Sequence, residues 1–272
     1  MRKLLCTVAL VAGASSAAPL AAQATRDQAR LVFNVSAGYI GGRGLWRVTG
    51  QPLFDDAVGN DVRIDTLTLS RSIKPTLTLG VKGIYFRGDN LGIYGEGYLV
   101  GLGYTDGCAR TFSTTSARNA EVCSSIDATE SSTSAVHIGT GLLYRVASRS
   151  TISPYGRIGL GAVIGNRSAL AVTGRFTSPS SDNQLVDVEV FTDETRVQVT
   201  PAGLVGIGMT AVLAPGYQLR WEIRDNIVGS RAVTGPTVQD GNPPPSSLRY
   251  RHLLGFEVGF DVVLERRRGR RY

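Results

Sequence analysis

Two histidines are the side chains in this sequence best suited to acid–base or nucleophilic chemistry. A serine becomes a nucleophile when a histidine takes its proton and an acid orients the imidazole. Each histidine is close in sequence to two serines, Ser132 and Ser134 for His137, and Ser246 and Ser247 for His252. Neither group has the Gly-x-Ser-x-Gly spacing of a nucleophile elbow. We therefore expect no catalytic residue and no enzyme activity.

A second group of side chains consists of charges of both signs within apolar or glycine-rich segments. Arg220, Glu222 and Arg224 stand at alternate positions, and Glu257 and Asp261 share a face of a later segment. On neighbouring strands these side chains would lie within cross-strand reach, and away from water they must pair. We expect one interior charge network formed by Lys82, Glu96, Arg157, Arg220, Glu222, Arg224, Glu257 and Asp261.

Two functions fit such a network. The charges could line a gated or selective polar pathway, or they could fill a narrow interior as an ionic plug that makes it rigid. We expect the plug. The strand pattern described below predicts a barrel of about eight strands, and such a barrel encloses a space only just wide enough for side chains.

Cys108 and Cys123 are the two cysteines that follow the N-terminal segment. In an exported chain they predict a disulfide, because that compartment is oxidising. The bond would close a loop of about 15 residues and stabilise the fold by about 3 kcal/mol in the chain-entropy model. Two cysteines without a nearby histidine do not complete a zinc site, and the acidic residues lack EF-hand spacing. We expect no metal and no cofactor.

Alternation of apolar with polar or small residues predicts the strands that must position these groups. The clearest run is Leu248 to Leu264, where one face is apolar except for His252 and the other carries Arg249, Arg251, Glu257 and Asp261. No segment shows a sustained helical period with caps at both ends. Further strands are predicted at 31–39, 76–85, 136–145, 157–164, 197–209 and 218–224, with a glycine-rich one at 90–104 whose facing the pattern leaves open.

The connections between these strands alternate in length. Short turns follow Phe86, Ala147 and Leu213, and long polar segments cover 41–63, 105–134, 165–195 and 229–247. Short periplasmic turns and long extracellular loops are typical of bacterial outer-membrane barrels. We predict an all-β, up-and-down antiparallel transmembrane β-barrel of about eight strands. The alternative is a soluble lipocalin-like barrel, with its apolar face inside.

The N-terminus predicts export. Arg2 and Lys3 precede an apolar run from Leu4 to Ala14, which is too short to span a bilayer as a helix, and a signal-peptidase site follows at Ala24. We expect three regions, namely a signal peptide at 1–24, a barrel domain at 25–265 and a basic periplasmic tail at 266–272.

The net charge of +7 does not predict a nucleic-acid-binding face. Arg2 and Lys3 leave with the signal peptide, and five arginines lie in the tail, so the body between is nearly neutral. Mean hydropathy is +0.01, a value typical of membrane barrels because only alternate residues face lipid. The basic tail indicates attraction to anionic headgroups or a solvated terminus.

The chain resembles the small outer-membrane barrels of the OmpA-like and OmpX-like group. The resemblance covers the signal peptide and nearly all of the mature chain. It includes the residue patterns of two segments, Asp89-Asn90-Leu91-Gly92-Ile93-Tyr94 and Leu254-Gly255-Phe256-Glu257-Val258-Gly259-Phe260. Such barrels usually end on an aromatic residue of the last strand, whereas this strand runs into Glu265 and five arginines before Tyr272.

This resemblance implies residence in the outer membrane. We expect a structural or surface-interaction role, with outer-membrane lipids as partners and an extracellular ligand contacted through the loops. The main alternative is a narrow passive channel for small or hydrophobic solutes, and the third is a lipid-modifying enzyme. We expect no nucleic-acid partner.

Overall fold

The computed structural model describes residues 27–53, 65–110, 117–127, 130–165, 172–178, 184–191, 198–237 and 243–268. The expected signal peptide at 1–24 lies outside these residues, as does the end of the basic tail. No helix in this described part of the chain is long and apolar enough to cross a bilayer.

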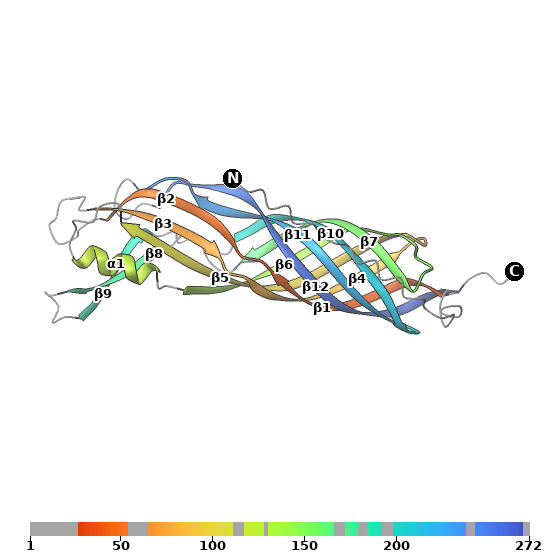
Figure 1. The fold of residues 1–272 in the computed structure, drawn as a ribbon. Helices are drawn as coiled ribbons and strands as arrows, with labels where there is room; N and C mark the ends of the chain where they lie inside the picture. Colours follow the sequence, from red (N-terminus) through yellow and green to blue (C-terminus); the bar gives the residue numbers. More distant parts are fainter. Residues whose placement is uncertain are drawn as a thin grey trace, which may run out of the picture.

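Eight antiparallel strands close into a barrel, as predicted (Figure 1). The last strand pairs with the first, from Asp27 opposite Arg268 to Ile40 opposite Gly255. Closure pairs the backbone of every strand with two neighbours, which the interior of a bilayer requires. The barrel strands are β1 (Asp27–Ile40), β4 (Thr76–Phe86), β5 (Leu91–Arg110), β6 (Glu130–Arg145), β7 (Ile152–Gly165), β10 (Gln198–Ala214), β11 (Tyr217–Val233) and β12 (Ser246–Arg268).

The two faces of the barrel wall differ in polarity. On β12, Phe256 points outward with 47% of its surface exposed, whereas Glu257 points inward and is 3% exposed. The outward sites of the other strands are likewise apolar, as at Leu79, Ile158 and Ile207. Apolar residues outside and charges inside are the arrangement of a membrane barrel, so the alternative of a soluble barrel is wrong.

The facing of the glycine-rich strand is resolved by the structure. On β5, Tyr94, Glu96 and Tyr98 are buried inside the barrel, and Ile93 and Leu99 are exposed outside. Several outward positions of this strand are glycines, which give the sequence pattern no side-chain signal.

Exposed aromatic residues lie near both ends of the outer surface. Tyr39 lies near the end of β1, and Tyr85 and Tyr144 lie near the opposite end of the barrel, at the ends of β4 and β6. Tyr217 stacks on Phe260 there, with 5.6 Å between ring centroids. Such rings suit the headgroup depth of a bilayer.

The short turns lie together at one end of the barrel, where β1 begins and β12 ends (Figure 1). The tightest connects β10 and β11 through Pro215 and Gly216. Gly216 adopts a φ of +94°, which a residue with a side chain rarely tolerates. β12 continues to Arg268, past the expected end of the barrel at 265.

The other end carries structured extensions where long polar loops are predicted (Figure 1). β2 (Arg43–Leu53) and β3 (Asp65–Ile73) form a hairpin, and β3 pairs with residues 104–110 at the end of β5. Helix α1 (Ala117–Asp127) packs against a hairpin of β8 (Val172–Ser178) and β9 (Gln184–Phe191). β2 carries two register shifts, which break the alternation by which strands are recognised.

The predicted disulfide is present and ties these extensions together. Cys108 near the end of β5 bonds Cys123 in α1, with 5.3 Å between their Cα atoms. Beside it, Arg71 on β3 forms a buried ion pair with Asp106 on β5 at 2.6 Å. Apolar side chains of the extensions pack with the upper barrel, including Leu45, Trp46, Leu69, Val122 and Val172.

Candidate functional site: a barrel interior with a charge network below an apolar pocket

All eight charges expected in the interior lie buried within the barrel. Glu257 on β12 sits between two cations. Its Oε1 is 3.1 Å from Lys82 Nζ on β4, and its Oε2 contacts Arg224 Nη1 on the neighbouring β11. In the barrel wall the order is β4, β1, β12, β11, so the Glu257 carboxylate links its own strand to β11 on one side and to β4, beyond β1, on the other.

A second group extends the network across the lumen. Arg157 Nη1 on β7 donates to Glu96 on β5 at 2.7 Å, and Arg157 Nε donates to Glu222 on β11 at 2.8 Å. Lys82 also lies 3.7 Å from Glu96, which joins the two groups. Glu222 stands directly opposite Glu257 in the ladder, and its carboxylate turns to Arg157 instead of a partner on β12.

A third group lies nearer the turns. Arg220 Nη2 is 2.6 Å from Asp261 Oδ2, and Asn34 Nδ2 donates to the other carboxylate oxygen at 2.6 Å. The network thus holds four cations and four anions, which leaves its formal charges balanced.

Aromatic rings that the sequence pattern did not predict complete this interior. Arg157 lies over Tyr94, Arg220 over Tyr155 and Arg224 over Tyr98, at 4.5 to 4.8 Å from the ring centroids. Tyr155 Oη also donates to Glu222 at 2.7 Å. The signal available in the sequence is parity, since Tyr94 and Tyr98 flank Glu96 at alternate positions.

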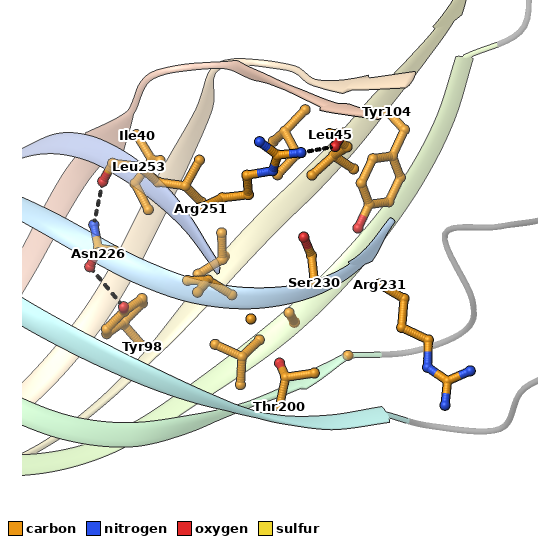
Figure 2. Close-up of a pocket in the computed structure, with 17 residues that line it drawn as sticks. Ile40, Leu45, Tyr98, Tyr104, Thr200, Asn226, Ser230, Arg231, Arg251 and Leu253 are labelled. Carbon is orange, nitrogen blue, oxygen red and sulfur yellow. Dashed lines mark hydrogen bonds between the residues drawn. The ribbon is translucent and has the colours of Figure 1, made fainter. Parts of the chain in front are cut away.

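Above the network, at the loop-bearing end, lies a cavity of about 100 Å³ that we call the outer pocket (Figure 2). Its lining draws on β1, β2, β3, β5, β6, β7, β10, β11 and β12, and most of it is apolar. The residues that define it here are Ile40, Leu45, Ile73, Tyr98, Val100, Val163, Asn226, Val228, Arg231, Arg251 and Leu253.

The base of the outer pocket is formed by polar groups that already have partners. Tyr98 Oη donates to Asn226 Oδ1 at 3.0 Å, and Asn226 Nδ2 donates to the Leu253 carbonyl oxygen at 3.1 Å (Figure 2). Tyr98 also stacks on His137, with 4.3 Å between centroids. Tyr98 thus separates the outer pocket from Arg224 of the charge network.

The two histidines occupy different environments. His137 is buried inside the barrel against Tyr98, and the neighbouring Ser134 is exposed. His252 lies on the outer surface, where its Nδ1 is 2.6 Å from Asp225 Oδ2. Among the described residues, the imidazole of His252 bonds Asp225, and the His252 carbonyl oxygen accepts a hydrogen bond from Arg43 Nη1; neither partner is a serine.

These features define a transmembrane β-barrel of the bacterial outer-membrane type, with an apolar belt, a polar interior and loops gathered at one end. No family model matches the chain, and no curated protein matches it.

Among solved structures, the outer membrane protein OprG of Pseudomonas aeruginosa is 11% identical, with a TM-score of 0.46, and the match covers 88% of this chain and 97% of that one. Neisserial surface protein A is 11% identical, with a TM-score of 0.43 and coverages of 86% and 97%. Ail of Yersinia pestis, solved with the heparin analogue sucrose octasulfate, is 12% identical, with a TM-score of 0.35 and coverages of 86% and 98%. At these values, the assignment to a class rests on the barrel itself.

Proposed function

We propose that this outer-membrane barrel binds a small apolar molecule from outside the cell and does not form an open channel. The observation that carries the proposal is the outer pocket, an apolar cavity at the loop-bearing end above an interior filled by paired charges. Ligand sites in proteins are usually concave and mostly apolar, with a few placed polar groups.

The charge network accounts for the direction of access. Below Tyr98, buried ion pairs and rings occupy the lumen from wall to wall, and moving a solute through would require separating them. Breaking one buried pair costs roughly 3–5 kcal/mol. Passage of solute, the main alternative function, therefore needs a rearrangement that ligand binding in the outer pocket does not.

The proposal is tested by filling the cavity. Val163→Trp places a large ring at a position of β7 that lines the cavity. Ile164→Trp places the same ring at the next position, which is exposed on the outer surface of the barrel. The probe is a decanol that carries a photoactivatable diazirine, and the protein is held in lipid nanodiscs. Mass mapping locates the label.

We expect saturable labelling of pocket residues in the native protein and in Ile164→Trp, and its loss in Val163→Trp. Label confined to the lipid-facing side chains of the native protein, as a membrane-dissolved probe would produce, would overturn the proposal.

A further inference from the structure

We propose that the outer pocket selects anionic amphiphiles, meaning single-chain acids with an apolar tail, and that Arg251 receives the acid group. This inference rests on the proposed function above and names the ligand class. The tail would lie against Ile40, Val100 and Leu253, and the head would reach the guanidinium.

The charges around the cavity favour an anion. Two arginines, Arg231 and Arg251, line the outer pocket, and no aspartate or glutamate is among its described lining residues. Arg231 is exposed, while Arg251 is partly buried and extends toward Leu45 (Figure 2).

Arg251 differs from every arginine of the charge network in its partners. Arg157, Arg220 and Arg224 each contact a carboxylate. Within the described part of the chain, Arg251 has no acidic partner, and its hydrogen bond goes to the Leu45 carbonyl oxygen. Its Nε is a buried donor without a partner among the same residues.

An unpaired cation next to apolar walls is costly, because those walls replace water that would solvate it. A carboxylate or another acid group would supply the missing charge and accept charge-assisted hydrogen bonds from a guanidinium. The base of the cavity needs no such group, since Tyr98 and Asn226 bond each other. Arg251 therefore offers an anion-binding position inside the cavity, and the apolar lining suits a hydrocarbon.

The test compares two probes of equal chain length, a diazirine-bearing decanoic acid and the matching decanol, on the folded protein in nanodiscs at neutral pH. Hydrogen bonds to charged groups contribute enough to predict a preference for the acid of about tenfold or more. Arg251→Gln should abolish this preference, because labelling by the acid should fall far more than labelling by the alcohol. Arg251→Lys should retain most of it, because the charge remains.

The matched control is Arg249→Gln. Arg249 lies two positions away on β12, is exposed and does not line the cavity. Its removal should change the preference by less than about twofold, since exposed charges are screened by water and salt.

Equal labelling by acid and alcohol, or a preference that survives Arg251→Gln or disappears in Arg249→Gln, would overturn the assignment of Arg251 and leave the proposed function standing. Absence of pocket labelling by both probes would instead reject the proposed function, and this inference with it.

Discussion

At the scale of single residues, Glu257 joins two cations of the charge network. It is buried between Lys82 and Arg224, two cations on different strands. Its neighbour Phe256 faces the opposite way, into lipid. Adjacent positions of one strand thus require a charged side chain on the inside and an apolar one on the outside. Substitutions at the two sites test the interior and the exterior of the barrel separately.

Glu257→Leu should destabilise the barrel by roughly 3–5 kcal/mol, because two buried cations lose a carboxylate. The measurement is the free energy of unfolding in urea, with the protein in lipid vesicles. Glu257→Gln retains oxygen and nitrogen atoms at the site and should lose less. A neutral outcome for Glu257→Leu would refute the interior charge network.

Phe256→Arg should impair insertion by roughly 2–4 kcal/mol if the position lies near the midplane of the bilayer. The measurement is the folded fraction recovered in vesicles at graded urea concentrations. Phe256→Leu is the control, since it keeps an apolar side chain there. Equal insertion of the arginine variant would place this face in water.

Gly141 marks a close approach of β6 to β7. A Cβ at this position would lie 2.1 Å from the Ile158 carbonyl oxygen and 2.7 Å from Tyr94 Oη, whereas at Gly95 it would meet nothing within 4 Å. Gly141→Ala should therefore cost about 1–3 kcal/mol in unfolding experiments, as overpacking does, and Gly95→Ala should be nearly silent. Equal effects of the two substitutions would contradict the packing of Tyr94 between these strands.

At the scale of elements, the strands were more predictable than the extensions. Alternation on β12 assigned Phe256 and Glu257 to opposite faces, and both assignments agree with the structure. The β2–β3 hairpin was missed because its register shifts interrupt the period of two. Helix α1 was missed because it lies in a polar segment with no sustained helical pattern.

The outer pocket could not be predicted, for a physical reason. Its lining comes from strands far apart in the sequence, and residues such as Val163 and Val228 look like ordinary strand residues on their own. Only the closure of the barrel brings them around one cavity. Arg251 gave no distinct signal either, because Arg249 and Arg251 alternate in the same strand.

The disulfide belongs to this scale because it joins β5 to α1 and not one barrel strand to another. Cys108 and Cys123 should resist alkylation in protein taken from the envelope until a reductant is added. Reduction should leave the barrel folded, since the closed ladder does not include this bond, and should loosen the extensions. Peptide mapping after alkylation measures the first effect, and limited proteolysis measures the second. Alkylation of both thiols without reductant, or unfolding of the barrel on reduction, would contradict this account.

At the scale of the whole molecule, the barrel differs along its axis. Its outer surface is apolar around the wall, its interior toward the short turns holds the charge network, and its interior toward the loops holds the outer pocket. Fold and location follow from the first two features. The proposed binding role follows from the third, because that part of the interior encloses a mostly apolar cavity.

Conductance of the native protein in a planar lipid bilayer tests the central claim, a membrane-spanning barrel whose interior is closed below the outer pocket. The folded state of the protein is first verified by its faster migration, when unboiled, on gels. With Lys82, Glu96, Arg157 and Glu257 paired across the lumen, the inserted protein should produce no discrete conductance steps. Regular steps of uniform size from the native protein would contradict the closed interior and favour a channel.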